Sequence, residues 1–109
     1  MQAWRLHDVT WNDREGHQSA RLIKDAETGT EAILVRYPAG NVTPDHVHPC
    51  AHGLLVIEGQ LFTQDGTFGP GDLVWYAEGD IGQHGATAAG PVTVLLFTNK
   101  AFGITYLQK

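Results

Sequence analysis

The sequence predicts an all-β protein, built as a sandwich or a barrel of short strands. Residues that interrupt regular structure recur at intervals of roughly ten residues, which is typical of short strands joined by turns. Glycine accounts for 13 of the 109 residues, and this fits a chain with many turns. No stretch shows the 3.6-residue period of an amphipathic helix. The length suffices for one domain, and we expect residues 1–109 to form it.

The first part of the chain contains two strand candidates. Residues 18–24 form a short one, and the turn-forming sequence D-A-E-T-G at 25–29 separates it from the next. Residues 30–37, T-E-A-I-L-V-R-Y, are rich in β-formers and lack polar alternation at their centre. This pattern predicts a strand that is at least partly covered on both faces. Residues 38–44 are expected to form a loop.

The second part adds further short strands between turn signals. Residues 54–62 predict either two strands or one strand bent at Gly59. The other strand candidates are 73–76, 92–98 and 102–107, and the predicted turns and loops are 65–66, 69–72 and 78–82. The last of these loops leads to His84.

The N-terminal segment, residues 1–17, is polar apart from a few apolar positions that include Trp4 and Trp11. Two tryptophans so close together suggest a segment that packs rather than a loose tail. We therefore expect an N-terminal arm that packs either on the barrel or on a partner subunit.

Composition excludes several classes of partner. The formal net charge is −5 and the seven basic residues are scattered, so neither nucleic acid nor an anionic membrane is expected as a partner. No apolar run is long enough to span a membrane. The first residues lack the pattern of a signal peptide, and the single cysteine, Cys50, rules out an intrachain disulfide. We expect a cytoplasmic protein.

Three histidines, His46, His48 and His52, follow the spacing H-x-H-x-x-x-H. Side chains two residues apart on an extended strand leave the same face, so His46 and His48 are expected to point the same way. His52 opens the apolar run of the next predicted strand. Imidazole is the commonest protein ligand of transition metals. We therefore predict a divalent metal site formed by His46, His48 and His52 and completed by His84.

The spacing around these histidines resembles the first motif of the cupin superfamily. From Gly40 to Gly59 the chain has G-x5-H-x-H-x3-H-x6-G, and His52 stands where cupins usually have glutamate. The chain is also similar to small single-domain cupins in which that glutamate is a histidine, which implies a four-histidine metal site. The phrases Y-P-A-G, L-V-I-E-G and G-P-G-D are similar to those of the branch with anti-sigma-factor cupin domains and β-diketone dioxygenases.

The second cupin motif is only partly kept. Gly71 and Gly79 match its two glycines, whereas Ala77 replaces its proline. His84 lies two residues later than the pattern requires, and Ala88 stands where the terminal asparagine belongs. The resemblance implies a double-stranded β-helix, or jelly roll, that holds the metal inside. Because cupins of this size commonly pair through a sheet, and Trp4 and Trp11 are available, we expect a homodimer.

The ligand set affects the chemistry expected at the site. A glutamate would cancel one of the two positive charges of the ion, whereas His52 does not, so the ion remains a stronger Lewis acid. Four protein ligands on octahedral iron or manganese leave two positions for a chelating substrate, or for substrate and dioxygen. Iron or manganese is expected, with zinc, nickel and copper as alternatives because imidazole suits them as well. A tetrahedral zinc ion would instead be closed and structural.

Three functions compete. The first is a metal-dependent oxygenase acting on a small, chelating organic substrate. The second is a metal-dependent isomerase, lyase or hydrolase without redox chemistry. The third is a non-enzymatic sensor or small-molecule binding module, for which the resemblance to anti-sigma-factor cupins is the precedent. No nucleophile elbow, phosphate-binding glycine loop or C-x-x-C pair points to other chemistry.

For other residues near the motif, a purely structural role is expected at least as much as a functional one. Cys50 is expected to be a small buried residue, with a soft ligand or a redox-sensitive thiol as the alternative. Trp75 and Gln83 are predicted either to line the pocket or to belong to the core or surface. His7 and His17 lie outside the motif and are expected on the surface.

Overall fold

A computed structural model describes residues 1–44, 46–48, 50–100 and 105–106, with the backbone alone at 46, 47, 105 and 106. In chain order the elements are the 3-10 helix η1 (Leu6–Asp8) and the strands β1 (Asn12–Arg14), β2 (His17–Lys24), β3 (Glu31–Tyr37), β4 (His46–Val47), β5 (His52–Glu58), β6 (Leu61–Thr63), β7 (Gly66–Phe68), β8 (Leu73–Tyr76), β9 (Ile81–Gly82), β10 (His84–Ala86), β11 (Val92–Thr98) and β12 (Thr105–Tyr106). The described part of the chain is therefore almost entirely β.

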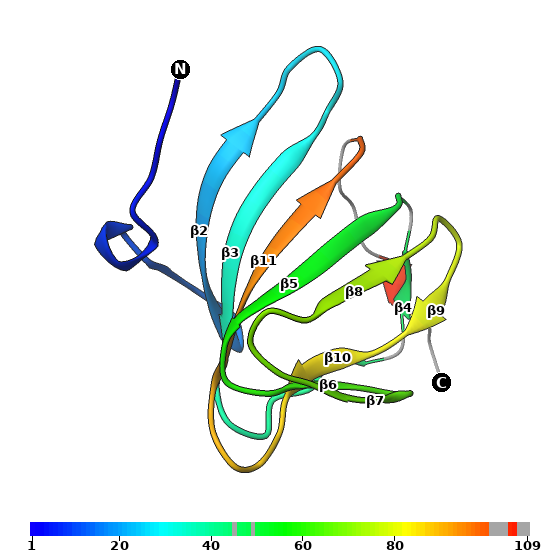
Figure 1. The fold of residues 1–109 in the computed structure, drawn as a ribbon. Coiled ribbons are helices and arrows are strands. Elements are labelled where there is room, and N and C mark those ends of the chain that lie inside the picture. The colour runs from blue at the N-terminus through cyan, green and yellow to red at the C-terminus, as the bar shows by residue number, and fades with distance from the viewer. Residues whose placement is uncertain (45, 49, 101–104, 107–109) are drawn as a thin grey trace.

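The strands form one large sheet and two small ones. The six-stranded sheet has the order β1-β2-β3-β11-β5-β8, and the two three-stranded sheets have the orders β10-β6-β7 and β12-β4-β9. Neighbouring strands are antiparallel throughout. Figure 1 shows β2, β3, β11, β5 and β8 side by side in a curved layer, with the small sheets to one side of it. This is the predicted jelly-roll arrangement.

The hydrophobic core lies between the large sheet and the sheet that contains β6 and β10. It contains alternate residues of the central strands, such as Leu54 on β5 and Val94 on β11, together with Leu61 on β6 and Ala86 on β10. These four side chains are at most 1% exposed. The alternation places one face of each strand inward, as a half-buried sheet requires. The core thus joins the two sheets to which His52 and His84 belong.

Most strands predicted from the sequence are confirmed. Strands β2, β3, β8 and β11 coincide with predicted segments to within one residue. Residues 54–62 form two strands, β5 and β6, which separate at Gly59, where φ is +85°. A Cβ atom there would collide with the carbonyl of Pro91. Of the predicted strand at 102–107, only β12 lies within the described residues.

One expectation about local structure was wrong. The predicted loop at 78–82 contains a short strand, β9, which pairs with β4. Two-residue strands carry too little pattern to be predicted, because their pairing depends on a distant partner. Within the segment predicted as an N-terminal arm, strand β1 extends the large sheet through β2. No helix in the described residues is long and apolar enough to cross a membrane.

Candidate metal centre

His48 directly follows β4 and is held in place by its backbone. Its amide donates to the carbonyl of Asp80 at 2.9 Å, and its carbonyl accepts from the amide of Gly79 at 2.7 Å. Its ring stacks on that of Tyr76, with 4.2 Å between the centroids and 10° between the planes. Because both the backbone and the ring are fixed, His48 has a defined orientation in the interior, where it is fully buried.

His52 is the first residue of β5, and His84 is the first residue of β10. His52 is paired with Thr98 and Tyr76 on the neighbouring strands of the large sheet. His84 is paired with Thr63, and its amide donates to the hydroxyl of Thr43 at 3.1 Å. Both side chains are buried, with exposed fractions of 0% and 2%. The two histidines therefore enter the interior from separate sheets.

The three described imidazoles converge on one point. One ring nitrogen from each of His48, His52 and His84 lies within 4.8 Å of those of the other two. The ring centroids of His48 and His52 are 4.6 Å apart, and those of His48 and His84 are 6.0 Å apart. Three of the four predicted ligands are thus brought together. The side chain of the fourth, His46, lies outside the described residues, although its backbone forms β4.

The second nitrogen of each ring has an oxygen beside it. Nδ1 of His48 donates to the carbonyl of Asp80 at 2.8 Å, and Nδ1 of His52 donates to the carbonyl of Cys50 at 3.1 Å. Nδ1 of His84 lies 3.2 Å from the hydroxyl of Tyr37. A carbonyl accepts and never donates, so in neutral rings of His48 and His52 the lone pair lies on Nε2. Metal-ligating histidines are oriented in this way, and the donor set fits a divalent transition metal.

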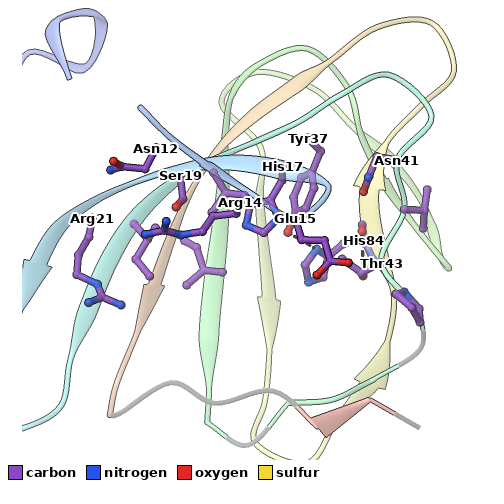
Figure 2. Close-up of a pocket in the computed structure, with 15 residues that line it drawn as sticks. Asn12, Arg14, Glu15, His17, Ser19, Arg21, Tyr37, Asn41, Thr43 and His84 are labelled. Atoms are coloured by element: carbon purple, nitrogen blue, oxygen red, sulfur yellow. Dashed lines mark hydrogen bonds between the residues drawn. The ribbon is translucent and has the colours of Figure 1, made fainter. Parts of the chain in front are cut away.

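A cavity of about 460 Å³ reaches the histidine cluster at His84. Tyr37 and Thr43 line the same end, and strands β1 and β2 form one wall (Figure 2). The volume lies within the range of roughly 300–1,000 Å³ that is usual for small-molecule sites. The cluster is therefore next to a space large enough for an organic ligand.

His17 and Tyr37 line the cavity beside His84, although their sequence context did not predict it. His17 was expected on the surface, but it is half-buried, lines the cavity, and has its ring centroid 5.8 Å from that of Tyr37. The alternation along β2 was the available signal, because His17, Ser19 and Arg21 share one face of that strand. Nothing in the sequence showed that this face lines the cavity beside the histidine cluster.

The residues next to the histidine cluster differ in their burial and in whether they line the cavity. Cys50 is fully buried, as expected, and burial raises the pKa of its thiol. Burial, together with the charges of Asp65 and Asp80, raises the pKa of Tyr76 to about 12. Trp75 is 55% exposed, and among the described residues neither it nor Gln83 lines the cavity at His84.

A model of the ChrR cupin-like domain matches residues 1–102. The chain belongs to this cupin family. It is 35% identical over 71 residues to the anti-sigma-E factor ChrR of Cereibacter sphaeroides, a match that covers 63% of this chain and 32% of ChrR. The cupin-like chain thus matches only about a third of the length of that relative.

Solved structures agree with the cupin fold. The anti-sigma ChrR in complex with SigE, from Rhodobacter sphaeroides, is similar with a TM-score of 0.73 and 28% identity, over 86% of this chain and 51% of that one. A candidate acetylacetone dioxygenase from Methylibium petroleiphilum is similar with a TM-score of 0.79, over 99% of this chain and 81% of that one. At 13% identity, the second likeness shows the fold alone.

Proposed function

We propose that this cupin-like domain binds one divalent transition metal through His46, His48, His52 and His84. Three buried imidazoles with converging nitrogens support the proposal. His46 is included because it begins β4 and lies two residues before His48, which directly follows that strand. Four neutral ligands leave the full charge of the ion in place, so iron or manganese bound here would polarise an oxygen-bearing ligand as a Lewis acid.

The function that the geometry supports best is a metal-dependent oxygenase acting on a small chelating molecule. The observation that carries it is the cavity of about 460 Å³ that ends at His84, because it gives an organic molecule access to the edge of the cluster. Tyr37 and Thr43 place hydroxyl groups at that end, where they can orient a ligand. A closed structural site would have no need of such a cavity.

A second candidate is a non-enzymatic module that binds a metal and a small molecule and passes the signal to a protein partner. The specific observation in its favour is the 35% identity to the anti-sigma-E factor ChrR. The match covers only 32% of ChrR, so the comparison concerns the cupin-like part of ChrR alone. A redox-neutral isomerase or lyase would use the same cavity.

Oxygen uptake distinguishes these functions. Protein reconstituted anaerobically with Fe(II) or Mn(II) is mixed with a panel of β-diketones, catechols and styrenes in air-saturated buffer, and oxygen consumption is recorded. The oxygenase predicts stoichiometric uptake that requires the metal and is lost in His52→Gln. Ligand binding without uptake supports the sensing module, and conversion under nitrogen with zinc supports the redox-neutral enzyme.

We also propose that the chain forms a homodimer in the cytoplasm. Leu73 and Trp75 support pairing, because they lie on the edge strand β8 with 57% and 55% of their surfaces exposed. Trp11 packs within its own chain, with the guanidinium of Arg36 over its ring at 4.1 Å. Sedimentation equilibrium at micromolar concentration tests the pairing, and a monomer would contradict it.

A further inference from the structure

The cavity beside His84 has a polar wall formed by strands β1 and β2. Arg14 is paired with His17 across the two strands, and Asn12 is paired with Ser19. All four residues line the cavity, as does Arg21 further along β2. Figure 2 shows Asn12, Ser19 and Arg21 toward one end of the cavity and His84 and Thr43 at the other, with Arg14 between them. The β1–β2 hairpin therefore presents two guanidinium groups to whatever occupies the space.

The facing surface is apolar. Ile33 and Val35 on β3 and Leu96 on β11 line the cavity. Because these residues belong to or pack against the core, they form a fixed hydrophobic floor. A ligand that fits this space combines a polar or charged end with a hydrocarbon segment.

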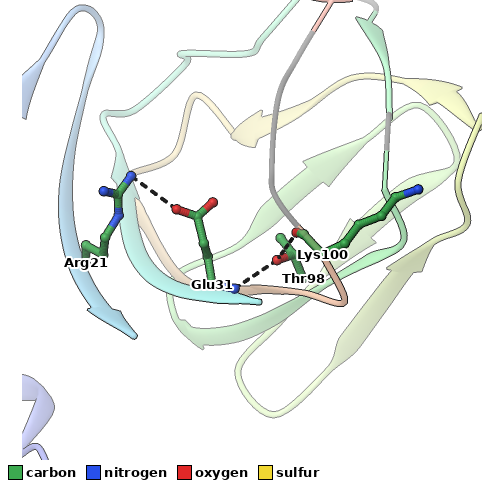
Figure 3. Close-up of polar contacts among 4 residues, drawn as sticks. All are labelled: Arg21, Glu31, Thr98 and Lys100. Carbon is green, nitrogen blue, oxygen red and sulfur yellow. Dashed lines mark hydrogen bonds and ion pairs between the residues drawn. The ribbon is translucent and has the colours of Figure 1, made fainter. Parts of the chain in front are cut away.

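The two arginines differ in how their charges are balanced. The guanidinium of Arg21 lies 3.3 Å from a carboxylate oxygen of Glu31, a side chain that is only 8% exposed (Figure 3). Arg14 makes no ion pair with any carboxylate among the described residues, and its guanidinium donates to the carbonyl of Asp13 at 3.4 Å. Arg14 is therefore the cation in this wall whose charge a ligand is best placed to balance.

Among the described residues, the carboxylate that lines the cavity lies toward its other end. Glu15 lines the cavity, and Figure 2 draws it toward the end at which His84 and Thr43 lie. An anionic group on the ligand is repelled from Glu15 and attracted by Arg14, so the charges give the ligand one orientation. The oxygen-bearing end then faces His84, and the anionic end faces the β1–β2 wall.

We propose that the ligand of this cavity is a small organic acid whose carboxylate is bound by Arg14. Its hydrocarbon segment lies on Ile33, Val35 and Leu96, and an oxygen at its other end faces the metal site. A guanidinium matches a carboxylate with two parallel hydrogen bonds, which makes Arg14 the specificity-determining residue. This inference rests on the proposed metal site and cavity, and adds the chemical class of the ligand.

A matched pair of compounds tests the inference. Octane-2,4-dione and 5,7-dioxooctanoate share the chelating diketone and a three-carbon chain, and differ only in that a carboxylate replaces the methyl group at the end of that chain. Their binding to the full chain loaded with Mn(II) is measured anaerobically by calorimetry. We expect the acid to bind at least about tenfold more tightly than the dione, and added salt to reduce this preference because Arg14 is exposed.

A bound metal also attracts a carboxylate, so variants are needed to distinguish the contribution of Arg14 to binding from that of the metal. Arg14→Gln is expected to weaken the acid about tenfold and to leave dione binding unchanged, and Arg14→Lys is expected to have an intermediate effect. Arg5→Gln is the matched control, because it removes the same charge from an exposed residue that does not line the cavity. Circular dichroism and metal content confirm that each variant is folded and loaded.

Each outcome has one meaning. A preference for the acid that is lost in Arg14→Gln but kept in Arg5→Gln supports the inference. Equal binding of acid and dione, or a preference that survives in Arg14→Gln, overturns the inference and leaves the proposed function intact. Binding of neither compound to the loaded protein overturns both the proposed ligand site and the inference.

Discussion

The hydroxyl oxygen of Tyr37 lies 3.2 Å from Nδ1 of His84, whereas Nδ1 of His48 and of His52 contacts a backbone carbonyl. Of these three Nδ1 contacts, the one made by His84 is thus to a side chain. Tyr37 also lines the cavity, so one residue contacts both a proposed metal ligand and the space for the organic molecule. If Nε2 of His84 bound a metal, its Nδ1–H would donate to the Tyr37 oxygen, and this hydrogen bond would hold the ring in place.

Removing the Tyr37 hydroxyl is expected to weaken metal binding. Tyr37→Phe keeps the ring and deletes the hydrogen bond that orients His84, so the affinity for Mn(II) should fall about tenfold. Competition with a chromophoric chelator measures the change. Tyr76→Phe is the control, because its ring stacks on His48 while its hydroxyl contacts only the carbonyl of Gln83 among the described residues, at 3.5 Å. Equal affinities in wild type and Tyr37→Phe would contradict this role.

The side chain of Cys50 is expected to be dispensable for metal binding. His52 is oriented by the backbone carbonyl of Cys50, and Cys50→Ala retains that carbonyl. The metal affinity should stay within about twofold of wild type, while loss of the buried sulfur lowers the free energy of unfolding by about 1 kcal/mol. The same chelator competition, with urea unfolding, measures both. A large fall in affinity would make the sulfur a ligand.

Two glycines with similar φ angles are expected to differ in their tolerance of a side chain. Gly59 has φ +85° with the Pro91 carbonyl against it, whereas Gly71 has φ +88° and nothing within 4 Å of a Cβ position. Gly71→Ala should cost about 1 kcal/mol from backbone strain alone, and Gly59→Ala about 3 kcal/mol because a collision is added. Urea unfolding in the presence of a chelator gives both values. Equal costs would show that the approach of Pro91 is not rigid.

The hydroxyl of Thr98 is expected to stabilise the open end of the large sheet. It accepts a hydrogen bond from the amide of Glu31 at 3.0 Å and donates to the carbonyl of Lys100 at 2.8 Å (Figure 3). Thr98→Val removes the hydrogen bonds of the hydroxyl to these two backbone groups. It should lower the free energy of unfolding by about 2 kcal/mol. Thr98→Ser keeps the hydroxyl and serves as the control. If the two variants unfold at the same urea concentration, the hydroxyl contributes nothing.

The sequence predicted the central strands well, because β3 and β11 are long, rich in β-formers and apolar at their centres. It also placed His48, His52 and His84 in one cluster, since their spacing follows a motif. The short strands were harder to predict. Strand β9 consists of two residues, and its pairing with β4 depends on distant contacts. His17 and Tyr37 were not assigned because their role comes from how β2 and β3 face the cavity, which is a tertiary relationship.

X-ray absorption spectroscopy of the metal-loaded protein tests the central claim most directly. With one equivalent of Zn(II) or Mn(II), we predict at least three imidazole nitrogens around the ion, at about 2.0–2.1 Å for zinc. His52→Gln should show one imidazole fewer. A spectrum dominated by oxygen ligands, or a wild-type protein that retains no ion after gel filtration, would contradict a metal centre built from these buried histidines.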